Sequence, residues 1–112
     1  MLDAAAITYY DIPYNVTMTD PSILILASLA DGDKHGYAMM EDVGRFAGVK
    51  LGPGTLYGAI TRLEERGWIR PTAAKDRRQP YTLTAAGRRH LVEQLESLGR
   101  FVSTGRERLG LA

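Results

Sequence analysis

The sequence of 112 residues contains no cysteine. Without a thiol, neither a disulfide framework nor a thiolate metal site can form. Histidine is also scarce, since His35 and His90 are the only two and lie in different predicted elements. A metal site built from them would need carboxylate ligands that no spacing in the sequence suggests. We therefore expect no metal and no other cofactor.

Long hydrophobic runs are absent as well. The longest apolar stretch, residues 23–30, is eight residues long and includes Ser28, whereas a membrane-spanning helix needs about 20 apolar residues. The N-terminus lacks the basic region and the long apolar core of a secretory signal. At this length the chain is expected to form one domain. These features predict a soluble, cytoplasmic protein with no membrane partner.

Catalytic motifs are also lacking. Gly52 and Gly54 begin a dinucleotide-like glycine pattern, but Tyr57 occupies the third glycine position and no predicted strand precedes it. The sequence has no Gly-Lys-Ser or Gly-Lys-Thr loop and no nucleophile-elbow serine. Glu64 and Glu65 are adjacent, so a helix would hold them about 100° apart and not as an acid/base pair. We expect a protein without enzymatic activity.

Charge is unevenly distributed, although the formal net charge is only +1. Residues 1–50 contain three basic and seven acidic side chains, whereas residues 60–90 contain eight basic and three acidic ones. Positive charge that is concentrated in one segment is typical of an anion-binding face. A solvated surface whose charge is lopsided by chance is the alternative.

The apolar spacing and the helix breakers predict the order helix, helix, turn, helix, two-stranded hairpin, helix. Pro21 and Pro53 suit the first turns of two helices, Thr84 suits a helix cap, and Gly67 suits a helix end. The predicted helices cover residues 21–30, 36–47, 53–66 and 85 onward, and the strands cover 68–72 and 81–83. The fold class is therefore mainly α with a small β-hairpin wing.

Two of these helices have apolar spacings that predict their buried faces. In the helix over residues 53–66, the spacing of four and then three residues predicts one core face, made by Leu56, Ile60 and Leu63. In the helix over residues 36–47, apolar residues recur every three positions and predict a single stripe, made by Tyr37, Met40, Val43 and Phe46.

The two ends of the chain are predicted to serve dimerisation. Residues 1–19 are interpreted as an N-terminal arm that contacts the partner protomer, and residues 85–112 as a dimerisation helix. That helix has apolar residues at the spacing of a coiled-coil seam, namely Leu91, Leu95, Leu98 and Val102. Gly99 and Gly105 weaken its far end, so fraying is expected beyond about Thr104. The intervening residues 20–84 form the predicted DNA-binding domain.

Two helices joined by a short glycine-containing turn and followed by a basic hairpin describe a winged helix-turn-helix. The second helix of such a pair can enter the major groove of DNA, which is about 12 Å wide. If its apolar residues face the core, its opposite face presents Thr55, Gly58, Thr61, Arg62 and Glu65. Thr55, Thr61 and Arg62 can hydrogen-bond to phosphates or base edges.

The tip of the predicted hairpin adds a cationic loop beside this helix. Lys75, Arg77 and Arg78 lie there and can reach the flanking DNA backbone or the minor groove. A solvated turn, charged only because turns are exposed, is one alternative. A winged-helix module that docks another protein without binding DNA is the other, because a fold does not fix a function.

Five short motifs follow one another over about residues 21–98. They are Ile25-Leu26-Ala27-Ser28-Leu29, His35-Gly36-Tyr37, Gly52-Pro53-Gly54-Thr55-Leu56-Tyr57, Arg62-Leu63-Glu64-Glu65-Arg66-Gly67-Trp68-Ile69 and Tyr81-Thr82-Leu83-Thr84-Ala85-Ala86-Gly87. In order and spacing they resemble the PadR family of bacterial transcriptional regulators. The resemblance implies a homodimer that binds double-stranded DNA at a pseudo-palindromic operator and acts mainly as a repressor.

The resemblance also implies which residues meet the DNA. Carried over by position, they are Tyr37, Pro53, Gly54, Thr55, Tyr57, Thr61, Arg62, Arg77 and Arg78. For Tyr37 and Tyr57, packing of the ring with the hydroxyl at the surface is an equally plain role.

A small aromatic effector is a further partner that the resemblance implies, because some members of that family bind aromatic or cationic molecules between the protomers. Tyr9, Tyr10 and Tyr14 of the arm, together with Trp68, are the residues expected to line such a cavity. An anchor in the core or in the dimer interface is the alternative role for Trp68.

Overall fold

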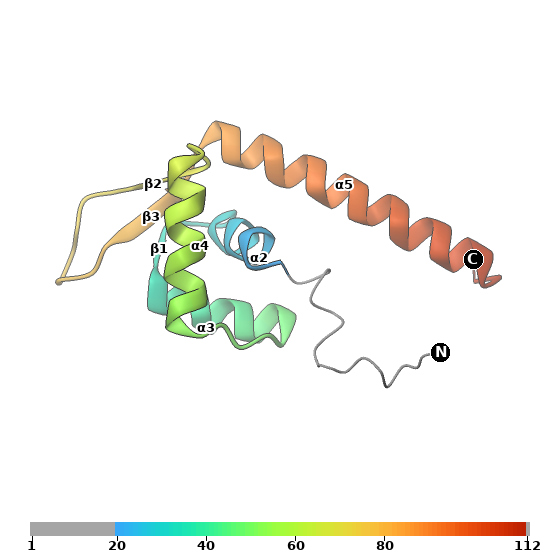
Figure 1. Cartoon of the computed structure of the whole chain (residues 1–112), viewed down its shortest axis with the longest axis horizontal. Helices are drawn as coiled ribbons and strands as arrows, with labels where there is room; N and C mark the ends of the chain where they lie inside the picture. Colours follow the sequence, from blue (N-terminus) through green and yellow to red (C-terminus); the bar gives the residue numbers. More distant parts are fainter. Residues whose placement is uncertain (1–19, 112) are drawn as a thin grey trace.

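The computed structural model describes residues 20–111. Its elements, in chain order, are α2 (Pro21–Leu29), β1 (Lys34–His35), α3 (Gly36–Ala47), α4 (Pro53–Glu65), β2 (Ile69–Pro71), β3 (Pro80–Leu83) and α5 (Ala85–Arg108). Helices α2, α3 and α4 gather at one end of α5, and the loop that joins β2 to β3 extends from the opposite side (Figure 1). The order of elements confirms the predicted mainly helical fold with a small wing.

Helix α2 forms the centre of the core. The Asp20 carboxylate caps it by accepting a hydrogen bond from the Ser22 backbone N–H at 2.8 Å. The helix contacts α3, α4, α5 and β3, and it is buried on most sides, as its apolar sequence predicts. The buried apolar members are Leu24, Ile25, Leu26 and Leu29.

The one buried polar side chain in the described core is fully hydrogen-bonded. The Ser28 hydroxyl donates to the Asp42 carboxylate of α3 at 2.7 Å. The Lys34 ammonium donates to the Ser28 carbonyl and also to the Asp31 carboxylate, the latter at 2.6 Å. That hydrogen bond and the Lys34 charge lower the pKa of Asp31. These bonds fix the turn between α2 and the first strand.

The wing is a three-stranded antiparallel sheet in the order β1-β3-β2, not the two-stranded hairpin that was expected. The added strand is β1, whose Lys34 and His35 lie opposite Tyr81 and Pro80 of β3. Two residues are too few to show an alternating pattern, so the sequence carries no sign of this strand. Through β1 the wing is tied directly to the start of α3.

Helix α3 turns a different face to the core from the one predicted. Gly36, Met39 and Val43 are buried, whereas Tyr37 and Phe46 are 58% and 51% exposed. Each step of three residues turns the side chain by about 60°, so Tyr37 and Phe46 lie on opposite sides of the helix. The prediction of one stripe through both residues is therefore wrong, because only alternating steps of three and four stay on one face.

Helix α4 buries the face that its spacing predicts. Leu56, Ile60 and Leu63 are at most 2% exposed, which confirms that interpretation. The helix ends where Gly67 adopts a left-handed conformation with φ of 75°, and the Trp68 N–H then donates to the Leu63 carbonyl at 3.0 Å. This arrangement is a Schellman ending, for which glycine is the favoured residue.

Helix α5 begins in close contact with the end of α4. The Thr84 hydroxyl caps it by accepting from the Gly87 N–H at 3.0 Å and donates to the Gly67 carbonyl at 2.7 Å. Gly87 is buried, and a Cβ on it would collide with the backbone carbonyl of Trp68. The close approach of these two backbones therefore requires the glycine at the end of the motif Leu83-Thr84-Ala85-Ala86-Gly87.

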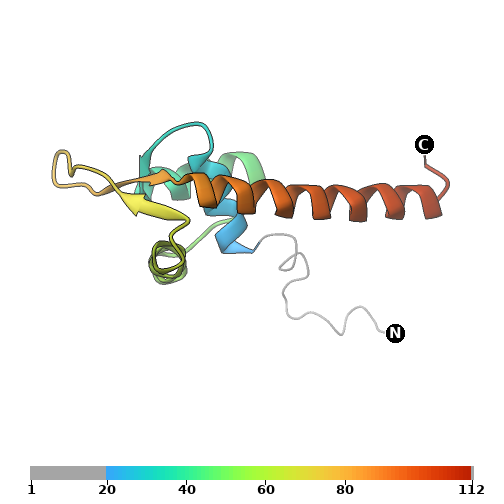
Figure 2. The same ribbon diagram turned by 90° about the horizontal axis from the view of Figure 1, so that it is seen from above.

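Beyond its first turns, α5 projects away from the wing (Figures 1 and 2). Its 24 residues span about 36 Å at 1.5 Å per residue, and it continues to Arg108, past the fraying expected near residue 104. Of the predicted seam residues, Leu91 is buried in its own protomer's core and Leu98 is half-buried. Leu95 and Val102 are 51% and 47% exposed.

Candidate nucleic-acid interface

The outward side of α4 is polar and open. Thr61 and Glu65 are exposed opposite the buried face of the helix, and Thr55, Tyr57 and Arg62 are exposed on its flanks. Pro53 at its first turn lies beside an N-cap, Gly52, that makes no side-chain hydrogen bond. The free amide groups at this end and the partial positive charge of a helix N-terminus suit a phosphate oxygen. Gly54 is exposed at the same end.

Two side chains on this face interact with their own helix. The Thr61 hydroxyl donates to the Tyr57 carbonyl at 3.0 Å, which leaves its oxygen lone pairs open to an incoming donor. The Arg62 guanidinium passes over Gly58, because a Cβ built on that glycine would lie 3.6 Å from Nη1. A Cβ there would be in ordinary van der Waals contact, so the position of Arg62 does not require a glycine at residue 58.

The tip of the wing is a tight two-residue turn between Lys75 and Arg78. The backbone N–H of each residue donates to the carbonyl of the other at 2.9 Å. Asp76 and Arg77 form the turn with φ of 52° and 64°, the positive values that a type I′ turn requires. Aspartate tolerates this conformation, but arginine does so at a cost that glycine would avoid. All four residues of the tip are exposed.

The wing, α3 and α4 meet around a cavity of about 330 Å³. Its lining combines guanidinium, phenol, imidazole and amide groups and contains no carboxylate. The lining residues are His35, Gly36, Tyr37, Tyr57, Arg77, Arg78, Gln79 and Tyr81. We refer to this cavity as the wing pocket. It brings together four of the residues predicted to meet DNA, which come from three separate elements.

Two tyrosines of the wing pocket are positioned by close contacts. Tyr57 packs its ring edge and hydroxyl against the backbone of Gly36, where a Cβ would come within 2.5 Å of that oxygen. The His-Gly-Tyr motif therefore requires its glycine so that Tyr57 can approach. Burial raises the pKa of Tyr81, and the charges of Glu64 and Tyr57 raise it further. The Tyr81 hydroxyl thus keeps its proton at neutral pH.

Four residues of the wing pocket were not predicted from the sequence to be site residues, namely His35, Gly36, Gln79 and Tyr81. His35 was considered only as a metal ligand, and Gln79 and Tyr81 were not considered as site residues. The Gln79 amide donates to the Thr72 and Pro80 carbonyls at 2.6 and 2.8 Å, so it holds the wing together. The signal that could have selected His35 is its place directly before Gly36, at the start of the predicted helix.

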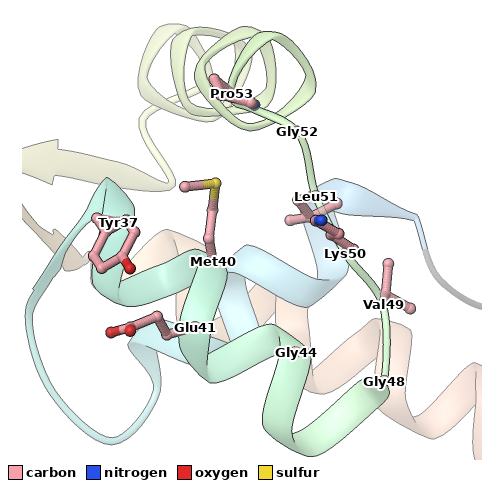
Figure 3. Close-up of a pocket in the computed structure, with 10 residues that line it drawn as sticks. All are labelled: Tyr37, Met40, Glu41, Gly44, Gly48, Val49, Lys50, Leu51, Gly52 and Pro53. Carbon is pink, nitrogen blue, oxygen red and sulfur yellow. The ribbon is translucent and has the colours of Figure 1, made fainter.

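A second cavity, of about 490 Å³, lies between α3 and the loop that leads into α4 (Figure 3). Met40 points into it from α3, and Tyr37 and Glu41 lie at one end. The opposite wall is the loop with Lys50 and Leu51. Tyr37 lines this cavity as well as the wing pocket.

Trp68 lies between α4 and β2 and does not line the wing pocket. Its ring stacks on His90 with the centroids 3.7 Å apart, and the Arg66 guanidinium lies 5.2 Å from its centroid. Tyr9, Tyr10 and Tyr14, the other residues of the expected effector cavity, lie outside the described residues. The effector cavity stays a prediction.

None of the helices that the structure describes has both the length and the hydrophobicity needed to cross a bilayer. Within residues 20–111, no three His, Asp or Glu side chains are grouped so that they could hold a metal ion.

Comparison with known families decides how this geometry is to be interpreted. The family model described as "Transcriptional regulator PadR-like family" matches residues 25–93, which cover the second half of α2, then α3, α4, the wing and the start of α5. The chain belongs to the PadR-like family. Membership places it among transcriptional regulators with a winged helix, which are not enzymes, and agrees with the expectation from the motifs.

Individual proteins are similar to this PadR-like chain in fold or in sequence. A transcriptional regulator from Clostridium thermocellum superposes with a TM-score of 0.73 at 23% identity, over 87% of this chain and 97% of that one. A PadR family transcription regulator from Clostridium difficile gives a TM-score of 0.67 at 26% identity, over 80% and 96%. An uncharacterized 37.1 kDa protein in transposon TN4556 of Streptomyces fradiae is 44% identical over 81 residues. Those residues are 72% of this chain but only 24% of that relative, so the chain spans about a quarter of its length.

Proposed function

We propose that this PadR-like chain binds duplex DNA as a homodimer, at a pseudo-palindromic operator, and represses transcription from the promoter it occupies. One observation carries the proposal. Tyr57 of α4 and Arg77 and Arg78 of the wing line the same cavity, so the helix and the cationic loop face one side. A duplex on that side would meet both at once, as a winged helix requires.

The residues of this face divide by the part of DNA that they would contact. Thr55, Thr61 and Arg62 lie along the exposed side of α4 and are assigned to base edges in the major groove. Residues that offer backbone amides, hydroxyls or flexible cations are assigned to phosphates, which set the register of the protein on the duplex. These are Tyr37, Gly54, Tyr57, Lys75, Arg77 and Arg78. Pro53 has no N–H to donate and is assigned to the interface because it starts α4, whose next amides face the phosphate.

Dimerisation through α5 supports a two-fold operator. Leu95 and Val102 are exposed apolar residues on a helix that leaves the domain, and a second copy of α5 would cover them. A symmetric dimer presents two α4 helices to half-sites about one turn of DNA, or about 34 Å, apart. Residues 1–19 are proposed to extend this interface.

Repression follows from occupancy, because a dimer seated on a promoter excludes other proteins from the same DNA. The family resemblance also supports repression over activation. We propose that the protein acts in the cytoplasm, where bacterial promoter DNA lies.

The affinity for DNA as a function of salt tests the proposal. Fragments of the intergenic region beside the gene, labelled for fluorescence anisotropy, should bind in the nanomolar range or tighter, and more tightly than scrambled duplexes. The logarithm of the affinity should fall with the logarithm of salt concentration by about 0.9 per phosphate contacted. Absence of binding at low salt, or an affinity that salt leaves unchanged, would instead favour a protein-docking module.

A further inference from the structure

His35 joins two parts of the molecule through its two ring nitrogens. Nδ1 accepts a hydrogen bond from the Ala38 backbone N–H at 3.3 Å and so caps the start of α3. Nε2 lies 3.1 Å from Nη1 of Arg78, which reaches back from the wing tip. The imidazole is half-buried, and Arg78 is exposed.

Both partners of His35 are donors, so the two contacts compete for the single acceptor nitrogen of a neutral imidazole. A neutral imidazole has one nitrogen that carries hydrogen and one that accepts. While Nδ1 accepts from Ala38, Nε2 must carry the hydrogen, and it then faces an Arg78 guanidinium that can only donate. Two donors at 3.1 Å do not form a hydrogen bond. The two side chains can keep these positions with the helix cap intact only if an acceptor lies beside them and receives hydrogen bonds from both Nε2–H and the guanidinium.

We propose that His35 and Arg78 form a clamp for one backbone phosphate of the DNA, in which the Nε2–H and the guanidinium donate to the same phosphate group. The inference rests on the proposed function and assigns one contact within it. A phosphate oxygen offers several lone pairs and a negative charge, so it converts the opposed donors into two charge-assisted hydrogen bonds.

The surroundings of the clamp favour an anion. Arg77 adds a second guanidinium to the wing pocket, and Tyr57 and Tyr81 bring phenol groups whose hydroxyls can donate. The N-terminus of α3, with its partial positive charge, begins at His35 itself. Two acidic side chains lie outside the lining: Glu64, whose charge acts on Tyr81, and the exposed Asp76, which precedes Arg77 in the turn. A cavity of about 330 Å³ is ample for one phosphate group.

The clamp would also explain why β1 exists. Pairing of His35 with Pro80 fixes the start of α3 against β3, the strand that directly follows Arg78 and Gln79. A phosphate held between them would therefore set the position of the wing and of the helix pair at once. His35 is then a contact that fixes register, distinct from the base-reading face of α4.

Nitrogen-15 NMR of the histidine rings tests the proton placement. In the full chain, long-range proton–nitrogen correlations of His35 should show a hydrogen on Nε2, both free and bound to a short duplex. Inorganic phosphate, added against chloride at equal ionic strength, should shift the Nε2 resonance in the wild type and leave it unchanged in Arg78→Gln. His90 serves as the internal reference. An Nε2 without hydrogen in the DNA complex would overturn the clamp, because that nitrogen would then accept from Arg78.

Affinity measurements test the same contact through paired variants. His35→Ser keeps a good N-cap but removes the Nε2 donor, and Arg78→Gln removes the charge. Each should weaken duplex binding about tenfold at about 50 mM salt. Only Arg78→Gln should lower the salt slope, by about 0.9. Because both act on one phosphate, the double variant should lose clearly less than the product of the two effects.

The matched control is Arg100→Gln, which removes an exposed cation from the far half of α5. If the wild type binds duplex while His35→Ser and Arg78→Gln both behave like Arg100→Gln, the clamp is wrong and the proposed function stands. If the wild type binds no duplex at all, the proposed function itself fails. His35→Ala, which removes the cap as well, should melt at a lower temperature than His35→Ser.

Discussion

Helices α4 and α5 both carry an apolar face, but only α4 has that face covered within the protomer. Leu56 and Leu63 of α4 are at most 1% exposed, whereas Leu95 of α5 is 51% exposed. Soluble monomers rarely leave such residues in a continuous row, and rows of this kind mark interaction surfaces. The contrast separates a helix that completes its own domain from one whose partner is another chain.

The exposed surfaces of α4 and α5 also differ in their chemistry. The open side of α4 carries hydroxyls, the Arg62 guanidinium and the Glu65 carboxylate, and it lies next to a cationic loop. That loop makes this region suit a wet, negatively charged ligand such as DNA. The open side of α5 carries Phe101 and Val102, which suit a dry protein contact. The chemistry of each exposed face thus indicates the class of molecule that covers it.

Removing a core side chain of α4 should have the largest effect on stability. Leu56→Ala truncates a fully buried side chain and leaves a cavity that the surrounding side chains fill only in part. We expect the free energy of unfolding to fall by about 2–5 kcal/mol, measured by urea denaturation followed by circular dichroism. A loss below about 1 kcal/mol would show that α4 is less firmly part of the core than its burial indicates.

Charges on the exposed seam of α5 should act on association and leave the fold intact. The double variant Leu95→Glu/Val102→Glu places carboxylates where a second copy of α5 would pack, and we expect the dimer dissociation constant to rise at least about a hundredfold. Light scattering at micromolar concentration should report a dimer for the wild type and a monomer for the variant, with unchanged circular dichroism. A wild-type monomer would contradict the two-chain interpretation of α5.

Two glycine-to-alanine variants compare a glycine that is required by packing with a glycine that is not. Gly87→Ala forces a methyl group against the Trp68 carbonyl at the joint of α4 and α5, so we expect a loss of about 1–3 kcal/mol. Gly44→Ala is the control, because a Cβ there meets nothing within 4 Å in the interior of α3. It should raise stability by up to about 1 kcal/mol through helix propensity alone. Thermal melts of both variants against the wild type measure the difference, and equal shifts would refute the close approach.

Much of the fold follows from local patterns in the sequence. The spacing of Leu56, Ile60 and Leu63 defines one face over two turns, and Gly67 and Thr84 mark helix boundaries through their own backbone chemistry. The core face of α3 could not be read from a spacing of three, because such a row winds around the helix. Strand β1 could not be read at all, since two residues become a strand only when β3 lies beside them.

The sequence predicts those residues of the candidate site that lie on a single helix. It does not predict the residues that two elements bring together. The exposed side of α4 follows from its buried side, so Thr55, Thr61 and Arg62 could be selected from periodicity. His35 joins the site because β1 pairs with β3 and brings Arg78 to its ring. That is a tertiary contact across 43 positions of the chain, and no local pattern encodes it.

The smallest stability effect is expected at the wing tip, where a strained backbone contrasts with the regular helix of α4. Arg77 holds φ of 64° in a turn where glycine would be unstrained, so Arg77→Gly should raise the melting stability by up to about 1 kcal/mol. The same change removes a cation that lines the wing pocket, so DNA affinity should fall severalfold and the salt slope by about 0.9. Calorimetry and anisotropy on one preparation measure the two effects together. A variant that is more stable and binds DNA as well as the wild type would leave the strain at Arg77 without a function. A gain in stability together with a loss of DNA affinity would mean that the turn keeps a strained arginine because its charge contacts DNA.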